Sequence, residues 1–340
     1  MRTFILIAML IAFPLNSSFA HSNNEFLDTV DKVRTSIVLV ESKREAESAG
    51  LTPLDEYLKE EKDEEPPTPT SIGTGFVVEG GYIITNNHVI DNSIDVVISF
   101  ENSSRRFAVD IIGTDKLTDI AVLKTKEPLP LDVEPLAWAS IGSLRAGMDV
   151  WAIGHPRGLD YTVSKGIISH LKRRIVNGWQ TVIQSDVSIN RGNSGGPLLD
   201  MDGNVIAINT MILSADGGSD GLSMSVDNRV AQWAIKKLIN GEKIERPKMG
   251  ISLKFDYEMS RVLAASIEEN SAAAKVGVLA EDIIMKAGGQ DINNIEELFD
   301  ALQYKAPGDS FPLLILRGEK LITFPLVLGK LEPESDSNSE

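Results

Sequence analysis

The chain has 340 residues, of which 42% are hydrophobic and only 6% aromatic, a composition that excludes wholesale disorder and a membrane-embedded helical bundle. The length exceeds that of one hydrophobic core, so we expect two domains. A formal net charge of −16 argues against nucleic acid or anionic lipid as the main partner. The sequence has no cysteine, which excludes a disulfide framework.

The first twenty residues have the organisation of an export signal. Arg2 precedes an apolar run over residues 4–15, and residues 18–20 form the small-x-small pattern that signal peptidases cut. An uncleaved membrane anchor is the alternative, but an apolar run of about 12 residues is short of the ~20 that span a bilayer. We therefore predict a signal peptide over residues 1–20, cleavage after Ala20 and a periplasmic mature chain.

Residues 25–34 are predicted to form a short amphipathic helix, and residues 37–40 a strand that begins the β-rich part of the chain. Between Glu41 and Glu65 there are ten acidic and four basic residues, and prolines follow, so this stretch cannot build a core. We predict an exposed inserted loop over residues 41–70, which is either a solvated insertion without function or a regulatory element.

Beyond the loop, short β-branched runs are separated by turn signals, a series that is typical of β-barrels or β-sandwiches. A helix over residues 229–240 closes this unit, and Gly241 is its expected stop. A linker leads to a smaller unit over residues 249–331, which mixes short strands with a helix over residues 294–304. Residues 332–340 form a polar tail that we expect to be disordered.

A serine lies among glycines in the string GNSGGP (residues 192–197), between two strand-like runs. Glycines beside a nucleophile let the backbone turn sharply and bring two N–H groups toward one point, as an oxyanion hole requires. Ser194 is therefore the candidate nucleophile, and the N–H groups of Gly192 and Ser194 are the candidate oxyanion-hole donors. A glycine-rich hairpin without function is the alternative.

The same string fits the G-x-S-x-G pattern of α/β-hydrolases. That family places its histidine after the serine, and none of the four histidines here follows Ser194. Chain order therefore excludes the α/β-hydrolase interpretation.

The candidate base is His88, at the end of a strand over residues 82–85, because a serine hydroxyl needs a base and imidazole titrates near neutral pH. His155 lies in a loop, and His170 neighbours three basic residues that would oppose imidazolium formation. We expect surface or turn roles for these two histidines.

The base in turn needs a carboxylate that fixes its tautomer. Asp119 stands directly before an apolar strand, so its side chain can be partly buried and still reach a neighbouring strand end. Asp115 is the competing carboxylate, and we expect it to point to water from a polar turn. Asp119 is therefore the candidate orienting acid.

Three strings in this order resemble the HtrA/Deg family of chymotrypsin-fold serine proteases: TNNHVI (residues 85–90), TDIAVLK (118–124) and GNSGGP. The resemblance implies a mostly β fold, with a trypsin-like protease domain of two six-stranded β-barrels over residues 21–242 and a small α+β PDZ domain behind it. It carries the roles of base, orienting acid and nucleophile onto His88, Asp119 and Ser194, between the barrels.

The resemblance also implies a substrate pocket lined by Ile189, Ile208 and Met211. Such an apolar, shallow pocket favours small or medium aliphatic residues before the cut. Asp186 is the one carboxylate that could recognise Arg or Lys there, and we interpret it instead as part of a turn.

The C-terminal unit, residues 249–331, resembles a PDZ domain. Its segment RPKMGI (residues 246–251) would hold a peptide's terminal carboxylate on backbone N–H groups around Gly250, with Met249 and Ile251 beside it, while the peptide adds as a strand. A purely structural cap is the alternative.

Residues 271–278 and 294–304 fit the two PDZ helices. The sequence departs from the PDZ pattern at Glu281, where glycine is usual, at residues 287–289, where an Asn-Gly turn is usual, and in a short stretch between Gly250 and the first helix.

Three further features follow from the resemblance. The acidic insertion occupies the place of a loop that in relatives regulates a neighbouring subunit, which implies a self-inhibitory or assembly role. Trimerisation is common in the family and would be mediated by residues 23–33. Residues 216–225 depart from the family's usual GFAIP ending.

The sequence thus favours an ATP-independent endopeptidase of protein quality control that cleaves unfolded chains and needs no metal or cofactor. A regulatory protease activated by a C-terminal peptide at the PDZ domain is one alternative, and a non-catalytic chaperone is another. The expected partners are unfolded proteins or peptides, C-terminal peptides and further copies of the chain, with no nucleic acid.

Overall fold

The computed structural model describes residues 18–44, 70–101, 103, 105–140, 142, 144–156, 161–174, 181–212 and 220–332. Several predicted segments lie wholly or partly outside these ranges: the signal segment up to residue 17, the inserted loop over residues 45–69, residues 216–219 of the segment over 216–225, and the tail from residue 333. Among the described residues, no helix is both long and apolar enough to cross a membrane.

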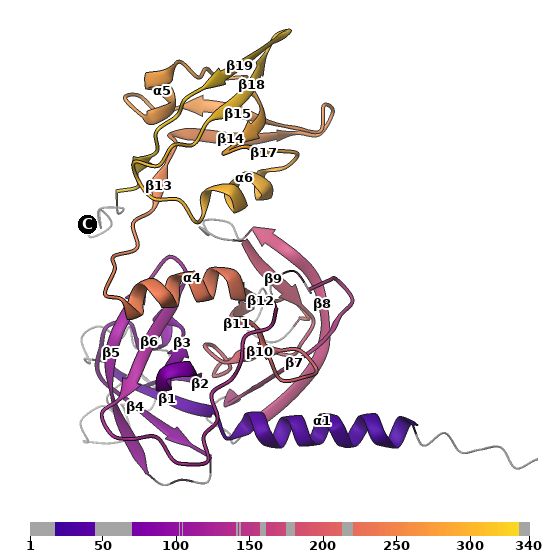
Figure 1. Cartoon of the computed structure of the whole chain (residues 1–340), viewed down its shortest axis with the longest axis vertical. Helices are drawn as coiled ribbons and strands as arrows, with labels where there is room; N and C mark the ends of the chain where they lie inside the picture. The colour runs from indigo at the N-terminus through magenta and orange to yellow at the C-terminus, as the bar shows by residue number, and fades with distance from the viewer. Residues whose placement is uncertain are drawn as a thin grey trace, which may run out of the picture.

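The first β-barrel closes in the strand order β1-β2-β3-β6-β5-β4 (Figure 1). Alternate side chains of its strands point into the barrel, where they form a separate core that includes Val40, Ile83, Ile98 and Leu123. The strands are β1 (Ile37–Arg44), β2 (Thr70–Val78), β3 (Tyr82–Thr85), β4 (Ser93–Phe100), β5 (Arg106–Asp115) and β6 (Ile120–Thr125), and a short 3₁₀ turn, η2 (Glu79–Gly81), joins β2 to β3.

One boundary of the inserted loop was predicted wrongly. Residues 41–44 continue β1: residues 41–43 pair with both β2 and β4, and Arg44 pairs with β4. Ser42 is buried, and the acidic Glu41 forms an ion pair with Arg106 at the start of β5. The acidic composition that suggested a loop from Glu41 onward therefore begins on a paired strand.

The second β-barrel closes in the order β10-β11-β12-β9-β8-β7. Its core includes Val150, Ile168, Ile183 and Leu198. The strands are β7 (Asp149–Gly154), β8 (Thr162–Arg174), β9 (Thr181–Ser185), β10 (Pro197–Leu199), β11 (Val205–Ile212) and β12 (Ser223–Asp227). The prediction of two six-stranded barrels is confirmed.

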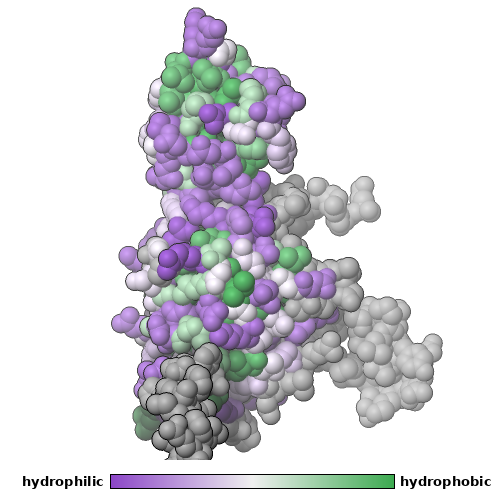
Figure 2. Space-filling model, turned by 90° about the vertical axis from the view of Figure 1, so that its right-hand side faces the viewer, coloured by the Kyte–Doolittle hydropathy of each residue, from purple (hydrophilic) through white to green (hydrophobic). Residues whose placement is uncertain are grey.

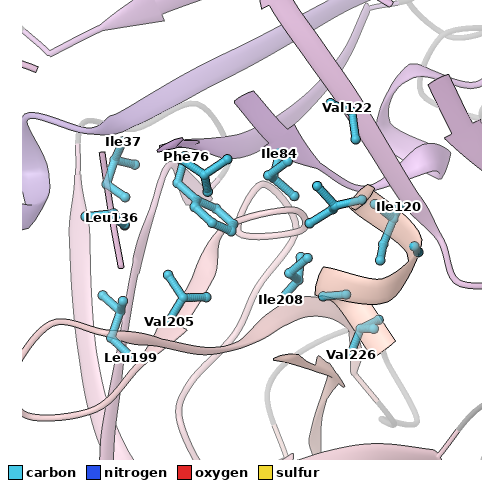
Figure 3. Close-up of a cluster of buried hydrophobic side chains, with 14 of the residues drawn as sticks. Ile37, Phe76, Ile84, Ile120, Val122, Leu136, Leu199, Val205, Ile208 and Val226 are labelled. Atoms are coloured by element: carbon cyan, nitrogen blue, oxygen red, sulfur yellow. The ribbon is translucent and has the colours of Figure 1, made fainter. Parts of the chain in front are cut away.

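A third apolar cluster joins the two barrels (Figure 3). Ile37, Phe76, Ile84 and Ile120 come from the first barrel, and they face Leu199, Val205, Ile208 and Val226 of the second. Helix α4 (Asn228–Ile239) closes the cluster and agrees with the predicted helix. This shared core fixes the relative position of the strand ends that carry the candidate site.

Helix α1 (Ser18–Arg34) begins earlier than the predicted helix and packs on the second barrel, with the ring of Phe26 edge-on to Trp151 at 5.4 Å between centroids. The predicted cleavage site after Ala20 falls within its first turn.

The C-terminal unit has its own core, which includes Val262, Leu298, Phe311 and Ile315. Its sheet runs β14-β15-β16-β18-β19, with β17 beside β16, and a separate pair, β13 and β20, joins its two ends. The elements are β13 (Pro247–Lys248), β14 (Ile251–Asp256), β15 (Arg261–Ile267), α5 (Ala272–Val276), β16 (Ile283–Ala287), β17 (Gln290–Asp291), α6 (Ile295–Leu302), β18 (Leu313–Arg317), β19 (Lys320–Phe324) and β20 (Gly329–Lys330).

Two departures from the PDZ pattern are accommodated locally. Glu281 adopts a φ of 67°, the left-handed conformation for which a glycine is usual, and Gly288 and Gly289 supply the positive φ angles of the turn between β16 and β17. The sheet with its two short helices therefore forms despite these substitutions.

Candidate active site

His88 lies on the one-turn helix α3 (Asn87–Ile90), directly after β3. Because β3 pairs with β6, with Thr85 opposite Ala121, the start of α3 lies beside Asp119, the residue before β6. His88 Nδ1 is 2.7 Å from Asp119 Oδ2, and the main-chain N–H of His88 donates to Asp119 Oδ1 at 2.9 Å. Both contacts fix the imidazole relative to the carboxylate.

Asp119 has a φ of 55°, a left-handed conformation that turns its side chain back toward α3. Its carbonyl oxygen accepts from the Asn87 N–H at 3.2 Å and from Asn86 Nδ2 at 2.8 Å. The hydroxyl of Thr210, on β11 of the second barrel, donates to Asp119 Oδ2. The carboxylate thus has hydrogen-bond partners in both barrels, which fixes its position between them.

Thr210 was not among the site residues predicted from the sequence. A signal was present, because Asn209 and Thr210 are two consecutive polar residues inside the otherwise apolar strand β11, and both are buried. Buried polar side chains in a strand need partners.

Ser194 lies in the turn before β10, and this turn depends on glycine at two positions. Gly192 and Gly195 have φ angles of 102° and 86°. A methyl group on Gly195 would overlap the hydroxyl of Thr85 and the carbonyl oxygen of Thr74. The turn therefore contacts the end of β3, three residues before His88.

Thr74 of β2 ties this turn to the first barrel. Its N–H donates to the carbonyl of Ser194 at 2.9 Å, and its hydroxyl donates to the carbonyl of Gly192 at 2.6 Å. The same hydroxyl accepts from the His155 N–H at 3.0 Å. The sequence analysis did not identify Thr74, whose role depends on contacts between strands far apart in the chain.

The candidate oxyanion-hole donors are available. Within the described part of the chain, neither the Gly192 nor the Ser194 N–H donates a hydrogen bond, and none joins Ser194 Oγ to His88. Such nucleophile–base hydrogen bonds often tighten only when substrate binds.

The competing carboxylate, Asp115, does not point to water as the sequence suggested. Its side chain is 10% exposed, and its Oδ2 accepts from the Thr118 N–H at 3.0 Å, from the Thr118 hydroxyl and from Arg246. Arg246 follows far along the chain, so the turn sequence alone could not indicate this burial.

The other two candidate histidines have different surroundings. His155 follows β7 in a turn, is buried, and packs its ring 4.5 Å from that of Tyr161. The surface alternative for His155 was therefore wrong and the turn alternative right. His170 is exposed on β8, where its Nδ1 accepts from the Lys172 N–H.

The three predicted pocket residues are not brought together at one surface. Ile208 is fully buried in the cluster between the barrels and has no exposed surface in this structure. Ile189 is buried in the core of the second barrel, whereas Met211 is 40% exposed. Asp186 accepts from the Ile167 N–H at 2.6 Å, as the turn interpretation expects.

The predicted carboxylate-binding segment, residues 246–251, runs through β13 into β14 and contacts the start of α5. Met249 is buried in the C-terminal core, and its carbonyl accepts from Ala273. Gly250 has a φ of 77° and contacts Ser271 so closely that a side chain would overlap it. Ile251 begins β14, which among the described strands pairs only with β15 and so has a free edge.

No group of three His, Cys, Asp or Glu side chains in the described ranges has an arrangement that could hold a metal ion.

Comparison with known families agrees with this architecture. A trypsin-like peptidase domain matches residues 73–208, and a PDZ domain matches residues 247–328. The chain is thus a serine endopeptidase that combines a trypsin-like domain with a PDZ domain.

Two relatives in bacteria are 33% identical to the chain. The match to the periplasmic pH-dependent serine endoprotease DegQ of Escherichia coli K12 extends over 317 residues, 88% of this chain and 69% of DegQ. The match to a probable periplasmic serine endoprotease, DegP-like, of Chlamydia trachomatis covers 77% of this chain and 54% of that protein. The chain belongs to the DegP/DegQ family of serine endoproteases.

Solved structures show the same fold. The HtrA-type protease AlgW with tripeptide matches with a TM-score of 0.75 and 24% identity, over 91% of this chain and 98% of that chain. The serine endoprotease from Yersinia pestis matches with a TM-score of 0.65 and 25% identity, over 90% of this chain and 98% of that chain.

Proposed function

We propose that this chain is an exported, ATP-independent endopeptidase that cleaves unfolded or misfolded proteins, with His88, Asp119 and Ser194 as its catalytic triad. The observation that carries the proposal is the pair of hydrogen bonds by which Asp119 holds both the ring and the main chain of His88, beside the turn of Ser194. The periplasmic location is supported by the predicted export signal and by the names of the relatives.

In the first half of the reaction, Ser194 Oγ attacks the scissile carbonyl carbon and its proton passes to His88 Nε2. Asp119 keeps the proton of His88 on Nδ1, so that Nε2 is free to accept, and stabilises the imidazolium that forms. The N–H groups of Gly192 and Ser194 bind the oxyanion of the tetrahedral intermediate. His88 then protonates the leaving amine, which leaves an acyl-enzyme on Ser194.

In the second half, water attacks the acyl-enzyme as His88 takes its proton, and Ser194 leaves with that proton restored. The balance of atoms requires only substrate and water, so the residues present account for the whole cycle.

The C-terminal unit is proposed to bind C-terminal peptides by adding them to the free edge of β14, with the carboxylate at Gly250. Support comes from the positive φ of Gly250 and from the edge position of β14. Assembly of several copies, as a trimer through residues 23–33, is part of the same proposal.

A regulatory protease activated by peptide is the second candidate, and one observation favours it. Helix α6 contacts the second barrel: Lys172 Nζ lies 2.6 Å from Asp300 Oδ2, and the Arg174 guanidinium lies 3.9 Å from the centre of the Phe299 ring. A peptide between α6 and β14 would act on a helix that already contacts β8.

The test compares casein hydrolysis by the mature chain and by its Ser194→Ala variant. The variant should lose several orders of magnitude in kcat, because the nucleophile is gone. Equal cleavage by both chains would overturn the assignment of Ser194. Adding C-terminal peptides separates the two candidates, since a regulatory protease cleaves casein only when peptide is present.

A further inference from the structure

Arg246 is a buried charge that the proposed mechanism does not use. Its side chain is 2% exposed and pairs with Asp115 at the end of β5. Its guanidinium lies 5.3 Å from the centre of the Trp233 ring on α4, and the ring of Tyr304, just beyond α6, packs edge-on against the same indole. Burial lowers the pKa of Arg246, and the Asp115 carboxylate opposes that shift.

The main chain of Arg246 stands where the C-terminal unit joins the barrels. Its carbonyl accepts from the Leu331 N–H at 2.8 Å, and the next residues pair with β20. The chain that enters the C-terminal unit and the chain that leaves it therefore meet at Arg246. Figure 2 shows hydrophilic side chains over this junction between the upper C-terminal unit and the barrels below.

Asp115 is also the cap of the turn that carries the candidate acid. The Oδ2 atom that Arg246 contacts accepts both the N–H and the hydroxyl of Thr118, which is itself buried. Asp119 follows directly, in its left-handed conformation. Asp115 Oδ2 thus connects Arg246, at the junction with the C-terminal unit, to Thr118, the residue before Asp119.

Because the Arg246–Asp115 pair is buried, losing one partner should disturb the structure more than losing a partner of a surface ion pair would. Exposed pairs contribute little, but removing one partner of a buried pair leaves an uncompensated charge that must find water or move. Without Arg246, the Asp115 carboxylate would reorient toward solvent and loosen its two hydrogen bonds to Thr118. The position of Asp119 would then be less well defined.

We propose that Arg246 and Asp115 are positioning residues for the orienting acid: through Thr118 they hold Asp119 in line with His88. The inference rests on the proposed triad. The junction with the C-terminal unit thereby helps to align His88 and Asp119, the two site residues of the first barrel. This role is separate from the contacts that α6 makes with the second barrel.

The test uses the full chain with Arg246→Met, Asp115→Asn and both changes together. Methionine keeps an aliphatic stem against Trp233 without the charge, and asparagine keeps the size of the Asp115 side chain but removes the negative charge that balances the buried Arg246. With a short peptide substrate, each single variant should lower kcat about 10–100-fold with little change in KM, as small misplacements of catalytic groups do. The double variant should be no worse than the worse single variant, because the pair acts as a unit.

A spectroscopic signature separates positioning from a loss of stability. In a Ser194→Ala background, the far-downfield NMR resonance of the proton on His88 Nδ1 reports its hydrogen bond to Asp119 without requiring activity. We expect this resonance to shift or broaden in Arg246→Met and to recover toward its original position in Arg246→Lys, which keeps the charge.

The matched control is Lys330→Met, which breaks the exposed ion pair with Glu245 at the same junction. It should leave both kcat and the resonance unchanged. An unchanged kcat and resonance in Asp115→Asn and Arg246→Met would refute the inference while the wild type still cleaves. If the wild type does not cleave, the proposed function fails, and the resonance still decides the inference on its own.

Discussion

Asp119→Asn is the sharpest single test of how the site is built. In the wild type, Oδ1 accepts from the main-chain N–H of His88, and Oδ2 lies 2.7 Å from His88 Nδ1. Asparagine has only one oxygen. If its NH₂ group faced the His88 main chain, two donors would meet, so the oxygen should keep that contact and the NH₂ group should face Nδ1.

This orientation of the amide favours the His88 tautomer that cannot act as the base. Nδ1 would have to accept a hydrogen bond from the new amide, so the ring proton would move to Nε2, which could then no longer take a proton from Ser194. A carboxylate-to-amide change that traps this tautomer lowers kcat about 10⁴-fold in a serine protease, which corresponds to about 5.4 kcal/mol in the activation barrier. KM should stay close to that of the wild type, because Asp119 acts on the reaction through His88.

The assay measures kcat and KM on one peptide substrate for wild type, Asp119→Asn, Asp115→Asn and Ser194→Ala, the last as the floor. The expected order of loss is Ser194→Ala, then Asp119→Asn, then Asp115→Asn. If Asp119→Asn retains a tenth or more of the wild-type kcat, or if Asp115→Asn is the more damaging change, the assignment of the acid is wrong.

Two further changes test other parts of the structure. Thr74→Val keeps the shape of a fully buried side chain but removes the hydroxyl that hydrogen-bonds to Gly192 and His155. It should lower the free energy of unfolding by about 1–3 kcal/mol, measured by urea denaturation, and should also reduce kcat. An unchanged kcat would show that Ser194 does not depend on the hydrogen bonds of Thr74. In the C-terminal unit, burial alone would raise the pKa of Asp282, but hydrogen bonds from Arg317 and the Leu279 amide outweigh it and lower that pKa. The stability that this lowered pKa contributes is present above the ordinary carboxyl pKa and is lost as pH falls through the lowered pKa. Asp282→Asn should therefore have a lower Tm than the wild type at neutral pH and the same Tm in strong acid, measured by calorimetry. An equal difference in Tm at every pH would refute the electrostatic cause.

The elements that sequence predicted well are those whose cause is local. The strands before His88 and after Asp119 could be identified from alternating or β-branched runs, and Gly192 and Gly195 from the turn that they permit. Because paired strands bring their ends together, the approximate neighbourhood of His88 and Asp119 followed from their positions at strand ends and from the family resemblance.

The parts that sequence did not predict depend on contacts distant in the chain. Thr74 and Thr210 act across the seam between the barrels, and Asp115 is buried by an arginine 131 positions later. Ile208 was assigned to a pocket because it lies on the strand after the hairpin, but both faces of β11 are covered over most of its length. A strand whose two faces are both buried gives no alternation from which an open face could be chosen.

Among the contacts between the C-terminal unit and the barrels, two ion pairs differ in burial and therefore in strength. At α6, Lys172 is 39% exposed in its pair with Asp300, so this contact is weak and easily exchanged for water. At the linker, Arg246 and Asp115 are almost fully buried, so separating them leaves a charge without compensation. Movement of the C-terminal unit should therefore open the α6 side first and pivot near Arg246. A peptide that displaces α6 could then act on β8 of the second barrel while the turn that carries Asp119 stays in place.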